Sequence, residues 1–187
     1  MKKIENLKQE LRKKFLERQK NLSDSYVKEA SEKIQAKILS SDVFKNAEKI
    51  FIYISTSKEP STWEIIKNAL NDGKKVYVPK CRNKNMFAVR IYDFENLIQG
   101  KLGILEPENF SEILPCEDFD LIIVPCLSAS VDGKRLGHGA GYYDKFLSKS
   151  RENQNIICLC FHEMLSSEIP MGENDFYIPK VFKDNEE

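Results

Sequence analysis

The sequence predicts an α/β fold: a single three-layer α/β/α domain with a largely parallel sheet and an N-terminal helical hairpin. Residues 49–78 can form a strand, a helix and a second strand within about 30 residues, and such a crossover makes the two strands parallel. Residues 120–125 are apolar on both faces, which is typical of a central strand in a parallel sheet. The length of 187 residues suits one domain, residues 1–187.

Two helices are predicted in the first 40 residues. Apolar side chains recur at helical spacing within 4–15 and again within 26–38. Between the two segments, Ser23 is a candidate N-cap for the second helix. We therefore expect an αα-hairpin that packs on the rest of the domain.

The middle of the chain alternates between strand and helix patterns. Residues 49–54 are rich in β-branched and aromatic side chains and predict a buried strand. Ser61 and Glu64 match a capping box at the start of a helix that Gly73 can close. Short strands follow at 76–78, just before Pro79, and at 86–92. The mixed segment 93–118 contains several glycines and prolines, so we expect mostly loop.

The last third is predicted to contain two strands and one helix. Residues 120–125 form the most apolar run of the chain, and 156–161 form a further strand. Between them lies the glycine loop, residues 133–141, followed by a helix over about 141–149. Residues 163–168 can form a short helical turn. The order of strand, glycine-rich loop and helix is a frequent phosphate-binding arrangement.

Composition narrows the class of protein. The chain has 29 Lys and Arg against 29 Asp and Glu, a balance that argues against a general nucleic-acid or anionic-membrane binder. A hydrophobic share of 41% and a charged share of 31% are typical of a soluble globular protein. The five cysteines are odd in number and contain no Cys-x-x-Cys pair, so we expect reduced thiols. We see no signal peptide, and we expect a cytoplasmic monomer.

The glycine loop is the strongest candidate for chemistry. Gly137, Gly139 and Gly141 lack a Cβ, so the backbone there can approach an anion closely or adopt a positive φ. The guanidinium of Arg135 adds a fork of donors that suits phosphate oxygens. The loop is expected at the carboxyl ends of the strands, where α/β sheets bind ligands. A flexible surface turn is the alternative interpretation.

Other candidates are weaker when taken alone. Asp144 falls in the first turn after the loop, where a carboxylate can stabilise the helix end or hold magnesium beside phosphates; both interpretations stay open. Lys8 and Arg12 share one helix face, which by itself indicates a solvated surface. Glu59 follows the first predicted strand. Zinc-ligand spacing around the two histidines, a Walker loop and a nucleophile elbow are all missing from the sequence.

Together these motifs resemble the 5-formyltetrahydrofolate cyclo-ligase family, also called methenyltetrahydrofolate synthetases. The family signature R-L-G-x-G-x-G-Y-Y-D matches residues 135–144. Further family motifs match Lys8 to Arg12, Glu59, the G-I-x-E-P segment at 103–107 and the segment 173–175 that ends in Asp175. The matches follow the family order over nearly the whole chain. Within 126–130 the sequence departs from the family, and Ser130 replaces a common aspartate.

The resemblance implies an enzyme that uses ATP and magnesium to convert 5-formyltetrahydrofolate to 5,10-methenyltetrahydrofolate. By similarity, the residues that hold ATP are Lys8, Arg12, Arg135, Leu136, Gly137, His138, Gly139, Ala140, Gly141, Tyr142 and Tyr143. The folate would contact Ile54, Glu59, His138 and Tyr142. Asp144 and Asp175 would hold Mg²⁺, and Arg135 and Asp144 would act in catalysis.

Two other functions stay open at this point. The chain can be a folate or nucleotide-binding module without turnover, or an enzyme such as a sugar-phosphate isomerase or acyl transferase on a similar scaffold. A product that forms only with ATP would separate the expected enzyme from both. The expected partners are 5-formyltetrahydrofolate and ATP, with no nucleic acid and no membrane.

Overall fold

The computed structural model describes residues 2–100 and 103–185 and contains a mostly parallel seven-stranded sheet. The sheet order is β11-β10-β7-β1-β2-β3-β6. Its parallel strands are β1 (Lys49–Ile52), β2 (Lys75–Arg82), β7 (Leu121–Val124), β10 (Asn155–Leu159) and β11 (Lys180–Phe182). The antiparallel edge is formed by β3 (Asn85–Ile91) and β6 (Ile113–Leu114). The predicted α/β class and largely parallel sheet are confirmed.

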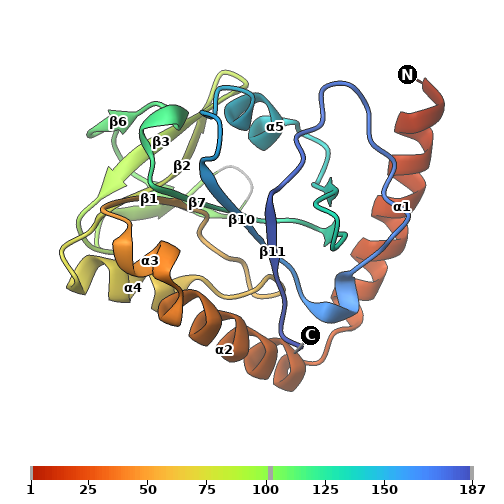
Figure 1. The fold of residues 1–187 in the computed structure, drawn as a ribbon, viewed down its shortest axis with the longest axis horizontal. Coiled ribbons are helices and arrows are strands. Elements are labelled where there is room, and N and C mark those ends of the chain that lie inside the picture. The colour runs from red at the N-terminus through yellow and green to blue at the C-terminus, as the bar shows by residue number, and fades with distance from the viewer. Residues whose placement is uncertain (1, 101–102, 186–187) are drawn as a thin grey trace.

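Helices cover both faces of this sheet (Figure 1). On one side lie α2 (Asp24–Ser40), α3 (Asp42–Asn46) and α4 (Trp63–Asn71), and on the other lies α5 (Tyr142–Leu147). The core between the layers includes Phe51, whose ring lies 4.8 Å from that of Phe146 on α5 and 5.6 Å from that of Phe119. The centre of the sheet is therefore dry on both faces, as the apolar run 121–124 predicts.

The N-terminal helices are present, but they do not lie side by side. Helix α1 (Lys2–Asn21) diverges from α2 after the turn at residues 22–23 and runs along one side of the molecule (Figure 1). Ser23 caps α2 as predicted, since its Oγ accepts a hydrogen bond from the Tyr26 amide at 3.2 Å. The predicted αα-hairpin is therefore corrected. Arg18 donates a hydrogen bond to the Glu163 carbonyl and the Phe15 side chain is buried, and these contacts hold α1 away from α2.

The predicted capping box at the start of α4 is wrong. Thr62 is the N-cap residue, and its hydroxyl donates to the Tyr53 carbonyl at 2.8 Å while it accepts from the Ser55 amide at 3.1 Å. The Ser61 carbonyl instead accepts a hydrogen bond from the side-chain amide of Gln35 on α2. Tertiary partners thus replace the local capping pattern and fix the loop after β1 that carries part of the site.

Strand β2 continues past Pro79, where the sequence predicts an end. Its pairing with β1 stops at Tyr77, so beyond that point β2 has β3 as its sheet partner on one side only. A proline is tolerated in a strand that needs no amide toward a second neighbour. Asn83 (φ 51°) and Lys84 (φ 60°) then turn the chain into β3 as a two-residue hairpin loop.

The segment 93–118 is more ordered than predicted. It contains β4 (Leu97–Gln99) and β5 (Leu105–Pro107), which pair with each other, the edge strand β6, and a single 3₁₀ turn (Cys116–Asp118). A second 3₁₀ turn, His162–Met164, lies at the start of the predicted helical turn. Each strand is only two or three residues long and is defined by its partner, so the local pattern carries little signal.

A small hairpin separates β7 from the rest of the glycine loop. It pairs β8 (Ser128–Ala129) with β9 (Arg135–Leu136), and Gly133 at its turn has φ +89°. A Cβ on Gly133 would lie 2.4 Å from the Ile178 carbonyl oxygen, so this glycine is needed for packing. Ser130 closes the turn, because its Oγ accepts from the Lys134 amide at 2.9 Å. Ser130, which replaces an aspartate that is common in the family, therefore lies in this turn.

Within the described residues, the helices include none that is both long and apolar enough to cross a membrane.

Candidate active site

A cavity of about 1570 Å³ opens at the carboxyl ends of β1 and β7. The chain leaves β1 toward β2 on one side and later places β7 on the other side of β1, so this is the topological switch point of the sheet. Every residue that the sequence nominates lines this cavity: Lys8, Arg12, Ile54, Glu59, Arg135, Leu136, Gly137, His138, Gly139, Ala140, Gly141, Tyr142, Tyr143, Asp144 and Asp175. The structure thus brings together motifs from both ends of the chain.

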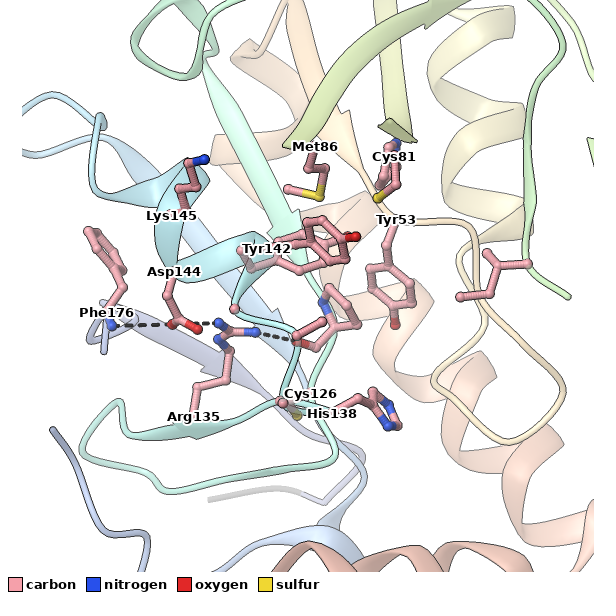
Figure 2. Close-up of a pocket in the computed structure, with 18 of the residues that line it drawn as sticks. Tyr53, Cys81, Met86, Cys126, Arg135, His138, Tyr142, Asp144, Lys145 and Phe176 are labelled. Carbon is pink, nitrogen blue, oxygen red and sulfur yellow. Dashed lines mark hydrogen bonds and ion pairs between the residues drawn. The ribbon is translucent and has the colours of Figure 1, made fainter. Parts of the chain in front are cut away.

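Arg135 and Asp144 form a partly buried ion pair at one wall of the cavity (Figure 2). Arg135 Nη2 lies 2.8 Å from Asp144 Oδ1, and its Nη1 donates to the Pro125 carbonyl at 3.3 Å. The same carboxylate oxygen accepts from the Phe176 amide at 3.3 Å. Among the described residues, Arg135 Nε has no hydrogen-bond partner although it is buried. The Arg135 side chain lines the cavity, so its guanidinium places a fixed positive charge there, which suits an anionic ligand.

Lys8 and Asp175 form a second ion pair across the cavity mouth. The Lys8 ammonium contacts Asp175 Oδ2, which also accepts from the Gly172 amide. The Lys8 side chain is 9% exposed and that of Asp175 17%, so the pair is largely shielded from water. The sequence alone suggests a solvated cation for Lys8; the fold instead turns this face of α1 inward.

Arg12 lies against the glycine loop one turn further along α1. Its Nε donates to the Gly137 carbonyl at 3.1 Å, and its Nη1 pairs with Glu5 at 2.7 Å. Gly139 has φ +100°, and a Cβ there would lie 3.2 Å from Arg12 Cζ. The missing side chain at Gly139 therefore lets the guanidinium rest on the loop backbone.

Replacing Gly139 by alanine is expected to weaken ATP binding, because the new methyl group displaces Arg12. We expect the KM for ATP to rise, by less than the roughly 10²-fold that a misplacement of 1 Å can cost. A Gly73→Ala variant is the matched control, since Gly73 also has positive φ (+72°) but nothing within 4 Å of its added Cβ. Both variants should lose about 1–2 kcal/mol of unfolding free energy from the left-handed backbone.

Steady-state kinetics at varied ATP and a urea titration separate the two effects. An equal change of the KM for ATP in both variants would show that the contact between Gly139 and Arg12 does not shape the site.

The start of α5 is set by Gly141 rather than by a side-chain cap. Gly141 adopts the left-handed conformation (φ 69°) as the N-cap residue, and α5 spans six residues, which is shorter than the predicted 141–149. A helix this short has few aligned peptide dipoles. Positive charge at this side of the cavity therefore comes from side chains, among them Lys8, Arg12 and Arg135, and we call this side the cationic wall.

Glu59 and His138 face each other at the opposite side of the cavity. Glu59 Oε2 accepts from both the amide and the hydroxyl of Thr56 at 2.8 Å, while its Oε1 lies 4.0 Å from His138 Nε2. The Glu59 side chain is 9% exposed. The Thr56 clamp fixes one carboxylate oxygen and leaves the other directed at the cavity, a geometry that can accept hydrogen bonds from a polar ligand.

Two phenols line the cavity near this carboxylate. Burial raises the pKa of Tyr53 and of Tyr143 well above the usual value, and the negative charge of Glu59 adds to the effect at both. The Tyr53 hydroxyl donates to the Pro60 carbonyl at 2.7 Å. The Tyr143 ring lies 5.6 Å from Arg135 Cζ. Both phenols stay neutral, and the ring of Tyr143 supports the Arg135 side chain.

Asp144 and Asp175 fit a magnesium ion only as partners of phosphate oxygens. The described residues contain no group of three His, Cys, Asp or Glu side chains placed to hold a metal. Each carboxylate uses one oxygen for its cation and a backbone amide, and the other oxygen receives no hydrogen bond from the residues that the structure describes. Mg²⁺ takes one or two carboxylates plus phosphates and water, so the donor set fits a metal that arrives with a nucleotide.

Part of the lining was not nominated from the sequence. Lys80 and Cys81 come from the extension of β2, and Glu106 and Phe110 come from the β5 region. Lys80 Nζ donates to the Pro107 carbonyl at 2.6 Å, lies 3.2 Å from Glu106 Oε1 and sits 5.3 Å from the Phe110 ring centroid. A lysine after a proline-interrupted strand gives no local sign of burial. The family match at Glu106 was the available signal.

Cys81 is expected to be the thiol that reacts in the folded protein, because it is exposed while the other four cysteines are buried. Burial of its sulfur and the charge of Glu106 raise the pKa of Cys81. The reactive thiolate is thus scarcer than in a free thiol near neutral pH, and the alkylation rate should reach half of its maximum at a pH above about 8.5, the midpoint of a free thiol.

Mass spectrometry after iodoacetamide treatment at several pH values measures this rate, with Cys81→Ser as the control that should stay unlabelled. A half-maximal rate at the pH of a free thiol, or labelling of a second cysteine in the folded protein, would contradict the assignment. Because Cys81 lines the cavity, bound ligands should slow the reaction.

The fold and the site define an α/β enzyme with a cation-lined backbone loop and two carboxylates at the switch point of its sheet. The chain matches the sequence profile of the 5-formyltetrahydrofolate cyclo-ligase family over residues 4–184. It therefore belongs to the 5-formyltetrahydrofolate cyclo-ligase family, which is a family of ligases.

Individual relatives agree with this assignment. The chain is 32% identical to a probable 5-formyltetrahydrofolate cyclo-ligase of Caenorhabditis elegans, with 98% of this chain and 95% of the relative covered. It is 28% identical to 5-formyltetrahydrofolate cyclo-ligase of Mus musculus, with 95% and 94% covered. The solved structure of Aquifex aeolicus 5,10-methenyltetrahydrofolate synthetase superposes with a TM-score of 0.85 at 28% identity, over 96% of this chain and 91% of that one.

Proposed function

We propose that the protein is a 5-formyltetrahydrofolate cyclo-ligase that uses ATP and Mg²⁺ to form 5,10-methenyltetrahydrofolate, ADP and phosphate. The observation that carries this proposal is the convergence on one cavity of every site residue that the family resemblance implies. A volume of about 1570 Å³ exceeds the roughly 300–1,000 Å³ of a typical single-ligand site, which supports binding of two substrates at once.

The chemistry explains why ATP is needed. The formyl oxygen on N5 of the folate is a poor leaving group, so direct attack by N10 on the formyl carbon stalls. In the proposed route the formyl oxygen attacks the γ-phosphorus, the bond to the bridging oxygen breaks, and ADP leaves. N10 then attacks the activated formyl carbon, loses its proton, and the C–O bond breaks to release phosphate. The former formyl oxygen ends in that phosphate.

The cationic wall of the cavity suits the phosphoryl transfer. Such transfer depends on positioning and charge neutralisation and requires no covalent protein nucleophile. In the proposal, Lys8, Arg12 and the glycine-loop amides bind the ATP phosphates. Arg135 lines the cavity and is held by Asp144, the Pro125 carbonyl and the Tyr143 ring, so its preorganised charge is suited to stabilise the transferring group. Asp144 orients Arg135 through their 2.8 Å contact.

Asp144 and Asp175 would hold the magnesium ion through their second oxygens. When bound, Mg²⁺ neutralises phosphate charge and fixes the phosphate orientation. Asp144 thus has two proposed tasks, which are to position Arg135 and to bind the metal.

The other side of the cavity suits the folate. Ile54, which is 4% exposed, offers an apolar contact, and Glu59 offers one fixed carboxylate oxygen to donors on the pterin ring. His138 and Tyr142 lie on the glycine loop and at the start of α5, where they can contact both ligands. In this arrangement the formyl group meets the γ-phosphate between the two walls.

The proposal is tested by incubating the pure protein with 5-formyltetrahydrofolate, ATP and Mg²⁺ and following the methenyl absorbance. We expect product only when ATP and the metal are both present. Product without ATP, or no product while ATP and folate bind, would overturn the proposed reaction. The monomeric state and the cytoplasmic location stay predictions, which size-exclusion chromatography and fractionation can check.

A further inference from the structure

Both carboxylates proposed to bind metal are already paired with a cation from the chain. Asp144 pairs with Arg135, which is fixed on the adjacent hairpin, and Asp175 pairs with Lys8, which extends from α1. The two cations differ in freedom. Arg135 is held by Pro125 and by the Tyr143 ring, whereas the Lys8 ammonium has Asp175 as its single contact in the described part of the chain. Lys8 is therefore the cation that can be exchanged.

The three ion pairs of α1 and the glycine loop together carry no net charge. Lys8, Arg12 and Arg135 carry three positive charges, and Glu5, Asp144 and Asp175 carry three negative charges. A divalent ion that arrives alone meets a carboxylate whose charge an ammonium already neutralises, so binding there either places two cations side by side or drives the ammonium off unpaired. A divalent ion that arrives with a nucleotide brings phosphate oxygens that can accept the displaced ammonium.

We propose that Lys8 is an exchangeable counter-cation of Asp175 that discourages binding of free metal and makes metal and nucleotide bind together. This inference rests on the proposed function, because it takes Asp175 as a metal ligand. In the free protein Lys8 neutralises Asp175. When metal and ATP bind, the metal takes the carboxylate and the Lys8 ammonium moves to the phosphates.

The exchange also ties α1 to the ligand. Lys8 and Arg12 lie on the same face of α1, and Arg12 contacts the glycine loop directly. Movement of Lys8 from Asp175 to the phosphates therefore keeps α1 over the cavity while its partner changes. Coupling between two ligands is reciprocal, so ATP must raise metal affinity by the same factor by which metal raises ATP affinity.

Lys8→Met tests the proposal with Mn²⁺ as the metal probe and electron paramagnetic resonance as the readout of free ion. Without nucleotide, Lys8→Met should bind Mn²⁺ at least about fivefold more tightly than the wild type, because Asp175 is released. With ATP present, the same variant should bind Mn²⁺ and ATP more weakly than the wild type. The factor by which ATP enhances Mn²⁺ binding should therefore fall.

Lys13→Met is the matched control, because Lys13 is an exposed lysine of α1 and its loss changes the net charge equally. It should leave both affinities unchanged. If, without nucleotide, the Lys8→Met variant binds Mn²⁺ no more tightly than the Lys13→Met variant does, the proposal is overturned. Adding Asp175→Asn to Lys8→Met should cancel the gain, and a gain that persists overturns it as well.

If circular dichroism shows that Lys8→Met does not fold, Lys8→Gln keeps a hydrogen-bond donor on a shorter stem and carries the same expectations. The metal titration tests the counter-cation proposal, and the product assay tests the proposed function, so a negative result in one can be told from a negative result in the other. A wild-type protein that makes product only with ATP and metal, but whose Lys8 variants show no gain, contradicts the counter-cation alone. Absence of ATP-dependent product contradicts the proposed function.

Discussion

Asp144→Asn should lower turnover at least a hundredfold while the fold survives. The asparagine keeps the shape of the carboxylate and can still accept from the Phe176 amide and from Arg135, whose contacts are 3.3 and 2.8 Å in the native site. It lacks the charge that holds the proposed metal and balances Arg135. A hundredfold loss corresponds to about 2.7 kcal/mol of transition-state stabilisation. The methenyl assay gives the rate, and a urea titration gives the unfolding free energy.

The stability change should be smaller than the catalytic one. We expect a loss of about 1–3 kcal/mol, because the buried guanidinium of Arg135 keeps a neutral acceptor in place of an ionic one. Asp132→Asn is the control, since Asp132 is an exposed residue at the tip of the β8–β9 hairpin that pairs with Lys134 at 2.9 Å. Similar turnover rates for the Asp144→Asn and Asp132→Asn variants would contradict a catalytic role for Asp144.

Arg135→Lys is the second variant with a large expected effect. Lysine keeps the positive charge, but a single ammonium cannot reach Asp144, the Pro125 carbonyl and a ligand at once, as the guanidinium fork can. We expect turnover to fall roughly 10²- to 10³-fold, the range seen when one donor to a developing negative charge is removed. Single-turnover measurements should show that the chemical step, rather than product release, is slowed.

Arg90→Lys is the matched control for this change. Arg90 pairs with Glu112 at 2.6 Å on the antiparallel edge of the sheet and lies over the Tyr92 ring. Its conservative replacement should leave turnover near the wild-type value. If Arg135→Lys retains wild-type kcat and KM for ATP, the fork geometry is irrelevant to catalysis and Arg135 serves packing alone.

The features that could be predicted from the sequence are those with strong local signals. The run at 121–124 is apolar on both faces and indeed forms a central strand, and Ser23 does cap α2. The capping box at Ser61 and the strand end at Pro79 followed the same local rules and were wrong. In each case a distant partner decides the outcome: Thr62 bonds to the loop after β1, and β2 loses its β1 partner before the proline.

The location of the site could be predicted better than its contacts. The glycine loop was expected at the carboxyl ends of the strands, and it lies there with a hairpin between β7 and residue 137. No spacing in the sequence indicates that Lys8 meets Asp175, because α1 reaches the cavity only through its packing. The burial of Lys80 was missed for the same reason, since its partners Glu106 and Pro107 lie on a three-residue strand.

The contact between α1 and Asp175 has a consequence for how the protein is made. It joins residues 167 positions apart in the chain. A growing polypeptide can form the helices and the first strands early, but it has no complete ligand-binding wall until residue 175 has left the ribosome. Ligands therefore bind and stabilise the finished chain and not its precursors. Substrate abundance in the cell would then protect completed molecules selectively against proteolysis.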